Sequence, residues 1–302
     1  MPERGGHSGI SSAPPPRPST SPDGAAAGYR ARRTLGFRVE ARRQLTRRRT
    51  QLSLGFLMVL PFILVAAFKL GSDDNDRGNA PALVDLATVG AANFTTFTLF
   101  VSAGFLLVVV VALYFGDTVA SEASWSSLRY LLALPVPRGH LLWRKLLVAL
   151  AYSVVALVLL PVVAYLAGGL FFGWDPLRTP LGVTLSGGEL FWRLVVMVAY
   201  LGVSLLFVAA LGFVIGVWTD APLGAVGGAV LLVIVSNILD AVTALGDWRQ
   251  LLPTHYQYAF TDVLGAQIVW TGMARGALLS CGYALVLFVA AWWHFNRKDV
   301  TS

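Results

Sequence analysis

Apolar residues along the chain fall into six long blocks that are separated by shorter polar stretches. The blocks run from Leu52 to Lys69, Phe94 to Phe115, Leu146 to Phe172, Leu190 to Val217, Pro222 to Leu239 and Gly276 to His294. A helix of about 20 apolar residues crosses the roughly 30 Å hydrocarbon core of a bilayer. Because backbone groups in lipid must be paired within the segment, the pattern predicts six transmembrane helices and an all-α fold.

The polar stretches carry an uneven distribution of positive charge. If the N-terminus lies inside, 17 of the 23 Lys and Arg residues fall on the cytoplasmic side and six on the other side. Cytoplasmic loops of membrane proteins carry this excess, so both termini are predicted to be cytoplasmic. The net charge of +7 then reflects topology, and we expect no nucleic-acid partner.

Composition narrows the class of protein further. Of the 302 residues, 56% are hydrophobic and 13% are charged, whereas soluble domains carry about 25% charged residues. The chain has one cysteine, Cys281, and four scattered histidines. These features argue against a soluble enzyme, a disulfide framework and a metal site, and we expect no catalytic residues and no directly bound cofactor.

Two segments precede the first span. Residues 1–33 are rich in Pro, Ser, Gly and Ala, which predicts a disordered cytoplasmic tail. Residues 34–50 are basic, and Phe37, Ala41 and Leu45 recur at a spacing of four, which predicts an amphipathic helix on the inner membrane surface. The alternative is a positively charged flank without structure of its own. Residues 51–298 form the predicted six-span domain.

The predicted cytoplasmic loop 116–145, between the second and third spans, has a pattern of its own. Asp117 and Glu122 are expected near the start of a short helix, where carboxylates complement the helix dipole. Leucines at 128, 131 and 132 give this segment an apolar face, and prolines at 135 and 137 end it. Such a helix suits contact with a partner protein.

This loop resembles the corresponding loop in the membrane subunits of ABC-2 type transporters. The resemblance lies in the order of Glu122, Ser127-Leu128-Arg129-Tyr130-Leu131-Leu132, Pro135-Val136-Pro137-Arg138 and Lys145, although Ser126-Ser127 stands where Gly-Thr is usual. It extends to the layout of the chain from about residue 35 onward.

The resemblance implies a complex with a separate ATPase, which binds and hydrolyses the ATP, and with a second permease subunit, in a homodimer or heterodimer. The segment 117–132 would be the coupling helix, with Glu122, Leu128 and Arg129 contacting the ATPase. Pro135, Arg138 and Lys145 would shape and anchor the end of the loop. The alternative is that the loop is only an anchored turn.

The segment before the last span is rich in aromatic residues. We expect Pro253, Tyr256, Tyr258 and Phe260 at the outer membrane interface. The resemblance implies that residues from about 247 to 272 form a re-entrant helical hairpin near the exit. The alternative is an interfacial loop.

One motif in the predicted outer loop between spans three and four is misleading. Leu185-Ser186-Gly187-Gly188-Glu189 spells the signature of ABC ATPases, but no Gly-Lys pair for a phosphate-binding loop exists in the chain. We interpret the match as a coincidence. Glu189 is expected to pair with Arg193, four residues later on the same helix face.

The middles of the six spans contain no ionisable residue, whereas ion-coupled carriers place such residues at membrane depth. This absence favours energy supplied from outside the membrane domain. Together with it, the resemblance to ABC-2 type transporters implies a permease subunit of an ATP-driven exporter in the bacterial plasma membrane, and the apolar spans suit a hydrophobic or amphipathic cargo such as a drug or lipid. Two alternatives stay open: a membrane scaffold or assembly factor, and an ion-coupled secondary carrier.

Overall fold

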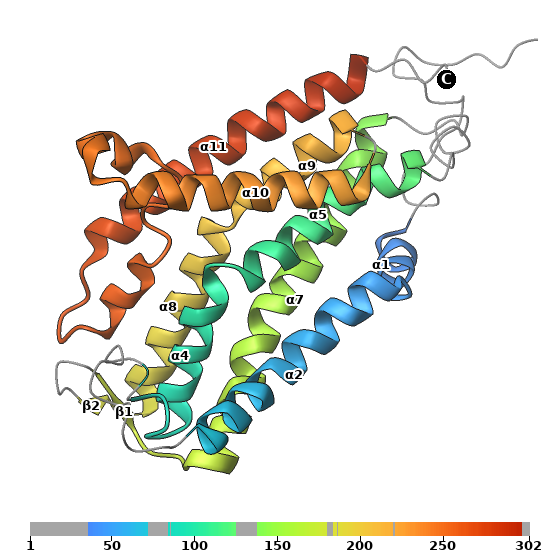
Figure 1. Cartoon of the computed structure of the whole chain (residues 1–302). Helices are drawn as coiled ribbons and strands as arrows, with labels where there is room; N and C mark the ends of the chain where they lie inside the picture. Colours follow the sequence, from blue (N-terminus) through green and yellow to red (C-terminus); the bar gives the residue numbers. More distant parts are fainter. Residues whose placement is uncertain are drawn as a thin grey trace, which may run out of the picture.

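The computed structural model describes residues 36–71, 84, 86–124, 138–179, 184–185, 187–219 and 221–297. The described part of the chain is mostly helical, and its long helices pack side by side into one bundle (Figure 1). The predicted disordered tail, residues 1–33, lies outside the described residues.

Nine α-helices, two 3₁₀ helices and one small antiparallel sheet make up the described part. The elements are α1 (Phe37–Leu45), α2 (Arg48–Leu70), α4 (Ala91–Ala103), α5 (Leu106–Ser124), α7 (Arg138–Phe172), β1 (Leu177–Arg178), β2 (Thr184–Leu185), α8 (Gly187–Ser204), α9 (Leu206–Thr219), α10 (Pro222–Ala241), η2 (Thr243–Leu251), η3 (Ala259–Leu264) and α11 (Trp270–Arg297). Within the described ranges, five helical stretches are long and apolar enough to cross a membrane, namely α2, α7, α8 together with α9, α10 and α11, and there are six if the bent pair α4 and α5 counts as one span. These helices cover the six predicted apolar blocks.

The second predicted span is broken rather than continuous. Helices α4 and α5 meet at an angle of 56° across Gly104 and Phe105. The break leaves carbonyl groups without helical partners, and the side chain of Gln257 donates one hydrogen bond of 2.6 Å to the carbonyl of Ala103. A residue far along the chain thus stabilises the bend.

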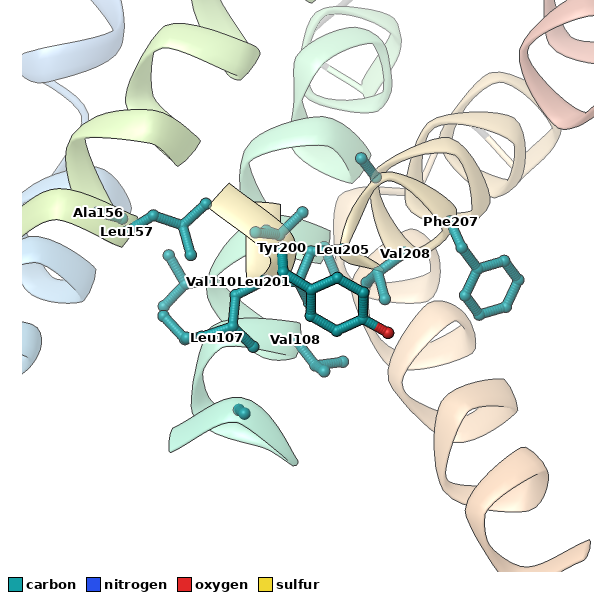
Figure 2. Close-up of a cluster of buried hydrophobic side chains, with 14 of the residues drawn as sticks. Leu107, Val108, Val110, Ala156, Leu157, Tyr200, Leu201, Leu205, Phe207 and Val208 are labelled. Carbon is teal, nitrogen blue, oxygen red and sulfur yellow. The ribbon is translucent and has the colours of Figure 1, made fainter. Parts of the chain in front are cut away.

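The core lies where α5, α7, α8 and α9 meet. Figure 2 shows Leu107 and Val108 of α5 packed near Leu157 of α7 and Leu201 of α8. Apolar side chains from several helices fill this region, which fixes α5 at the centre of the bundle.

Two loop boundaries differ from those that we predicted. Helix α5 continues to Ser124, so Asp117 and Glu122 lie in its last turns and not at the start of a separate helix. Helix α7 begins at Arg138 and not near Leu146. Hydropathy marks only the membrane-crossing part of each helix, and both helices extend beyond it. The stretch that joins them, residues 125–137, lies outside the described residues.

Candidate functional site

The ends of several helices meet at one end of the bundle. Figure 1 shows α1, the start of α2, the end of α5 and the start of α7 near one another. We call this region the basic end and define it by Glu40, Arg47, Arg49, Asp117 and Lys145. The charge distribution of the sequence predicts that it faces the cytoplasm.

Asp117 of α5 is the most buried carboxylate of the basic end, since only 4% of its side chain is exposed. Nη1 of Arg47 donates to its Oδ2 at 2.7 Å, and Nη1 of Arg49 donates to its Oδ1 at 2.8 Å. Both arginines lie at the N-terminus of α2, where the helix dipole disfavours positive charge. The carboxylate offsets that charge and ties α2 to α5.

A second buried ion pair joins α1 to α7. Nζ of Lys145 donates to Oε1 of Glu40 at 3.0 Å, and the two side chains are 5% and 13% exposed. About two helical turns further along α7, the hydroxyl of Tyr152 donates to the carbonyl of Ala41 at 2.7 Å. Helix α1 is therefore bonded to α7 at two points.

Neutral hydrogen bonds complete the contact between these helices. The hydroxyl groups of Ser53 on α2 and Tyr114 on α5 lie 2.9 Å apart. The side chain of Gln44 on α1 donates to the hydroxyl of Thr50 on α2 at 3.3 Å. Helices α1, α2, α5 and α7 thus form one hydrogen-bonded unit at the basic end.

The structure brings together only part of the predicted coupling site. Lys145 is buried against Glu40, whereas Glu122 and Arg138 belong to α5 and α7 by their backbone and their side chains are outside the described part. Leu128, Arg129 and Pro135 lie outside the described residues. Whether these residues contact an ATPase stays a prediction.

Sequence reasoning missed the pairing partners of the basic end. Asp117 and Arg47 are 70 residues apart, and Glu40 and Lys145 are 105 residues apart. One available signal was that Asp117 comes directly after an apolar span and is predicted on the same side of the membrane as the arginine-rich residues 34–50, whose charges need partners.

The aromatic segment before α11 folds back onto the helices. Phe260 is fully buried in the core, and the hydroxyl of Tyr200 on α8 donates to the carbonyl of Tyr256 at 2.6 Å. The ring of Tyr258 packs against Phe100 with centroids 4.9 Å apart, and burial raises the pKa of the Tyr258 hydroxyl. Pro253 is half-buried.

Two short 3₁₀ helices, η2 and η3, occupy this segment. Its depth in a membrane, and so the predicted re-entrant hairpin, stays a prediction.

The predicted pair of Glu189 and Arg193 is confirmed. Nη2 of Arg193 donates to Oε1 of Glu189 at 2.6 Å. Nη1 of the same buried arginine donates to the carbonyls of Val263 and Gly265, at 2.5 and 2.6 Å. Arg193 therefore also holds the end of η3 against α8, which the spacing alone did not indicate.

The charged side chains of the basic end link one helix to another. Within the described ranges, no group of three or more His, Cys, Asp or Glu residues is placed to hold a metal ion. The buried carboxylates of Asp117 and Glu40 are paired with cations of other helices, and these pairs hold the helices together.

The long apolar helices define the class of protein: the chain is a helical, multi-pass membrane protein. It belongs to the family described as Protein of unknown function (DUF2705), whose model matches residues 84–301. No curated protein is significantly similar to the chain.

Proposed function

We propose that the chain is the membrane-spanning permease subunit of an ATP-driven exporter of the ABC-2 type. The observation that carries the proposal is the pair of buried ionic contacts at the basic end. They join α1 and α2 to α5 and α7, the two helices between which residues 125–137 run. The loop motif in residues 116–145 supports the same function.

The contacts suggest how movement of the loop would reach the membrane. An ATPase that pushes on residues 125–137 displaces the ends of α5 and α7. Since Asp117 and Lys145 are bonded to the segment from Glu40 to Arg49, α1 and the start of α2 move with them. Helix α5 packs in turn against α9 and α10, so the displacement reaches the centre of the bundle.

The composition of the spans supports a hydrophobic or amphipathic cargo such as a drug or lipid. The middles of the spans carry no ionisable side chain, and an apolar path needs no chain of polar groups to carry its cargo. In this proposal a separate ATPase hydrolyses the ATP, and a second permease subunit, identical or similar, completes the pathway.

Purification of the tagged chain in mild detergent tests the proposal. We expect an ATPase of the ABC type to purify with it and to hydrolyse ATP. Glu122→Ala and Arg129→Ala are expected to weaken the association or to uncouple hydrolysis from transport. Asp247→Ala is the matched control, because it removes an exposed charge from η2, on the predicted opposite side.

The result that contradicts the proposal is a wild-type chain that purifies without any ATPase in several detergents. Transport that survives ATP depletion and stops when the ion gradient collapses would favour the secondary carrier. A recruited partner without any transport would favour the scaffold.

A further inference from the structure

An open apolar groove runs along the outside of the bundle between α7 on one side and α8, α9 and α11 on the other. Two adjoining hollows form it, each with a volume of about 330 Å³. They share Phe115, Leu150 and Leu206 as lining residues, so they lie directly next to each other. Helix α5 contributes Phe115 to both hollows, and the groove belongs neither to the basic end nor to the aromatic segment.

The groove is long enough for a lipid chain. Its lining residues on α7 extend from Trp143 to Val158, which corresponds to about 22 Å along a helix. One leaflet of the hydrocarbon core is about 15 Å thick. The side chains of Val154 and Val158 stay about half exposed, so the groove opens sideways, where a membrane helix meets lipid.

One end of the groove has the chemistry of a membrane interface. Trp143 of α7 and Trp292 of α11 line that end, and tryptophan is enriched where the hydrocarbon meets the headgroups. The ring of Trp292 lies against Gly139, in the first turn of α7. Arg144, which is half-buried, follows Trp143 on α7 and therefore lies at the same depth, beside the groove and outside its lining.

We propose that this groove is a binding site for one acyl chain of an anionic phospholipid, with the phosphate of the headgroup at Arg144. The apolar walls accept the chain, the tryptophans mark the depth of the headgroup, and the guanidinium provides the charge that a phosphate requires. The bound lipid fills the gap between α7 and α11. The proposal does not depend on the proposed transport function.

One polar atom in the wall of the groove allows a phospholipid to be told apart from other ligands. The hydroxyl of Ser153 is buried, lines the groove and has no hydrogen-bond partner among the described residues. It lies ten residues from Trp143, about 15 Å along α7, so a headgroup at Arg144 does not reach it. A phospholipid therefore requires nothing from Ser153, whereas an amphipathic ligand with a polar group at this depth would use it.

The test uses the purified full-length chain and native mass spectrometry with phosphatidylglycerol and phosphatidylcholine that carry the same acyl chains. We expect one phosphatidylglycerol to be retained in preference to phosphatidylcholine. Ala199→Phe puts a ring into the groove from α8 and should weaken retention about tenfold, since displacing even two methylene groups has that effect. Ala66→Phe on α2 is the matched control, because that residue is exposed and does not line the groove.

A second pair of variants tests the headgroup. Arg144→Gln should reduce the preference for phosphatidylglycerol about fivefold, as expected for one basic residue at a membrane surface. Arg275→Gln, at the exposed start of α11, should leave the preference unchanged, and so should Ser153→Ala. Val154→Trp, which fills the groove from α7, replaces Ala199→Phe if that variant does not fold.

Two results would overturn the proposal. The first is retention of phosphatidylglycerol that filling the groove does not change. The second is binding that depends on Ser153 and is indifferent to Arg144, which would assign the groove to a different ligand. A failure of the proposed ATPase partnership leaves these measurements unaffected, so the two proposals are tested separately.

Discussion

At Gly216 the backbones of α9 and α5 come so close that no side chain fits between them. A Cβ atom at this position would lie 2.6 Å from the carbonyl oxygen of Gly116. Gly212 makes a similar approach to Ala112. Small residues let membrane helices approach closely, and Gly212 and Gly216 have this role between α9 and α5. Gly227 on α10 faces open space instead.

We expect Gly216→Ala to destabilise the bundle, because the new methyl group must push α9 away from a backbone oxygen. Overpacking of this kind typically costs about 1–3 kcal/mol. Thermal unfolding of the detergent-purified protein measures the effect. Gly227→Ala is the matched control and should be neutral or slightly stabilising. Equal melting temperatures for the two variants would contradict the close approach.

Local side-chain pairs could be predicted from the sequence, whereas distant ones could not. Glu189 and Arg193 share a helix face because of their spacing, and the structure confirms the pair. The partners of Asp117 depend on how α2 packs against α5. No periodicity carries that information, since a charge outside a span has many possible partners.

Among the helices, α1 is joined to α7 by one ion pair, between Glu40 and Lys145, beside the hydrogen bond from Tyr152 to Ala41. Removing one member of a buried ion pair leaves the other uncompensated, which typically costs about 3–5 kcal/mol. Lys145 is nearly fully buried, so water does not take the place of the carboxylate when Glu40 is replaced. The ionic part of the contact between α1 and α7 therefore depends on both charges.

A double-mutant cycle on Glu40→Gln and Lys145→Met measures this contact. We expect each single variant to lower the stability, and the double variant to cost less than the sum, with a coupling energy of roughly 1–3 kcal/mol. Arg42→Gln, on the exposed face of the same helix, serves as the control and should change little. Strict additivity of the two variants would rule out a direct ion pair.

Hydropathy predicted where the spans lie but neither the break between α4 and α5 nor the true ends of the helices. An apolar block has the same composition whether it is straight or bent at Gly104. The bend is instead stabilised by Gln257, 154 residues from Ala103. Likewise, α5 and α7 extend past their apolar blocks into polar sequence that we predicted to be a loop.

For the whole molecule, the charge distribution predicts that the basic end lies in the cytoplasm and η2 on the opposite side. Cys281 is the only cysteine, so a Cys281→Ser background allows single cysteines to report orientation. In intact cells, a membrane-impermeant maleimide should label Asp247→Cys and should not label Arg42→Cys. Both should react after lysis. Labelling of Arg42→Cys in intact cells would reverse the predicted topology.

The central claim is that residues 125–137 dock on a separate ATPase, and photo-crosslinking in native membranes tests it most directly. A photoreactive amino acid at Leu128 should crosslink to an ATP-hydrolysing protein, because that position lies in the predicted coupling segment. The same amino acid at Trp248, which is exposed on η2, should not. An ATPase captured at position 248, or none at position 128 in membranes that contain the intact chain, would contradict the account.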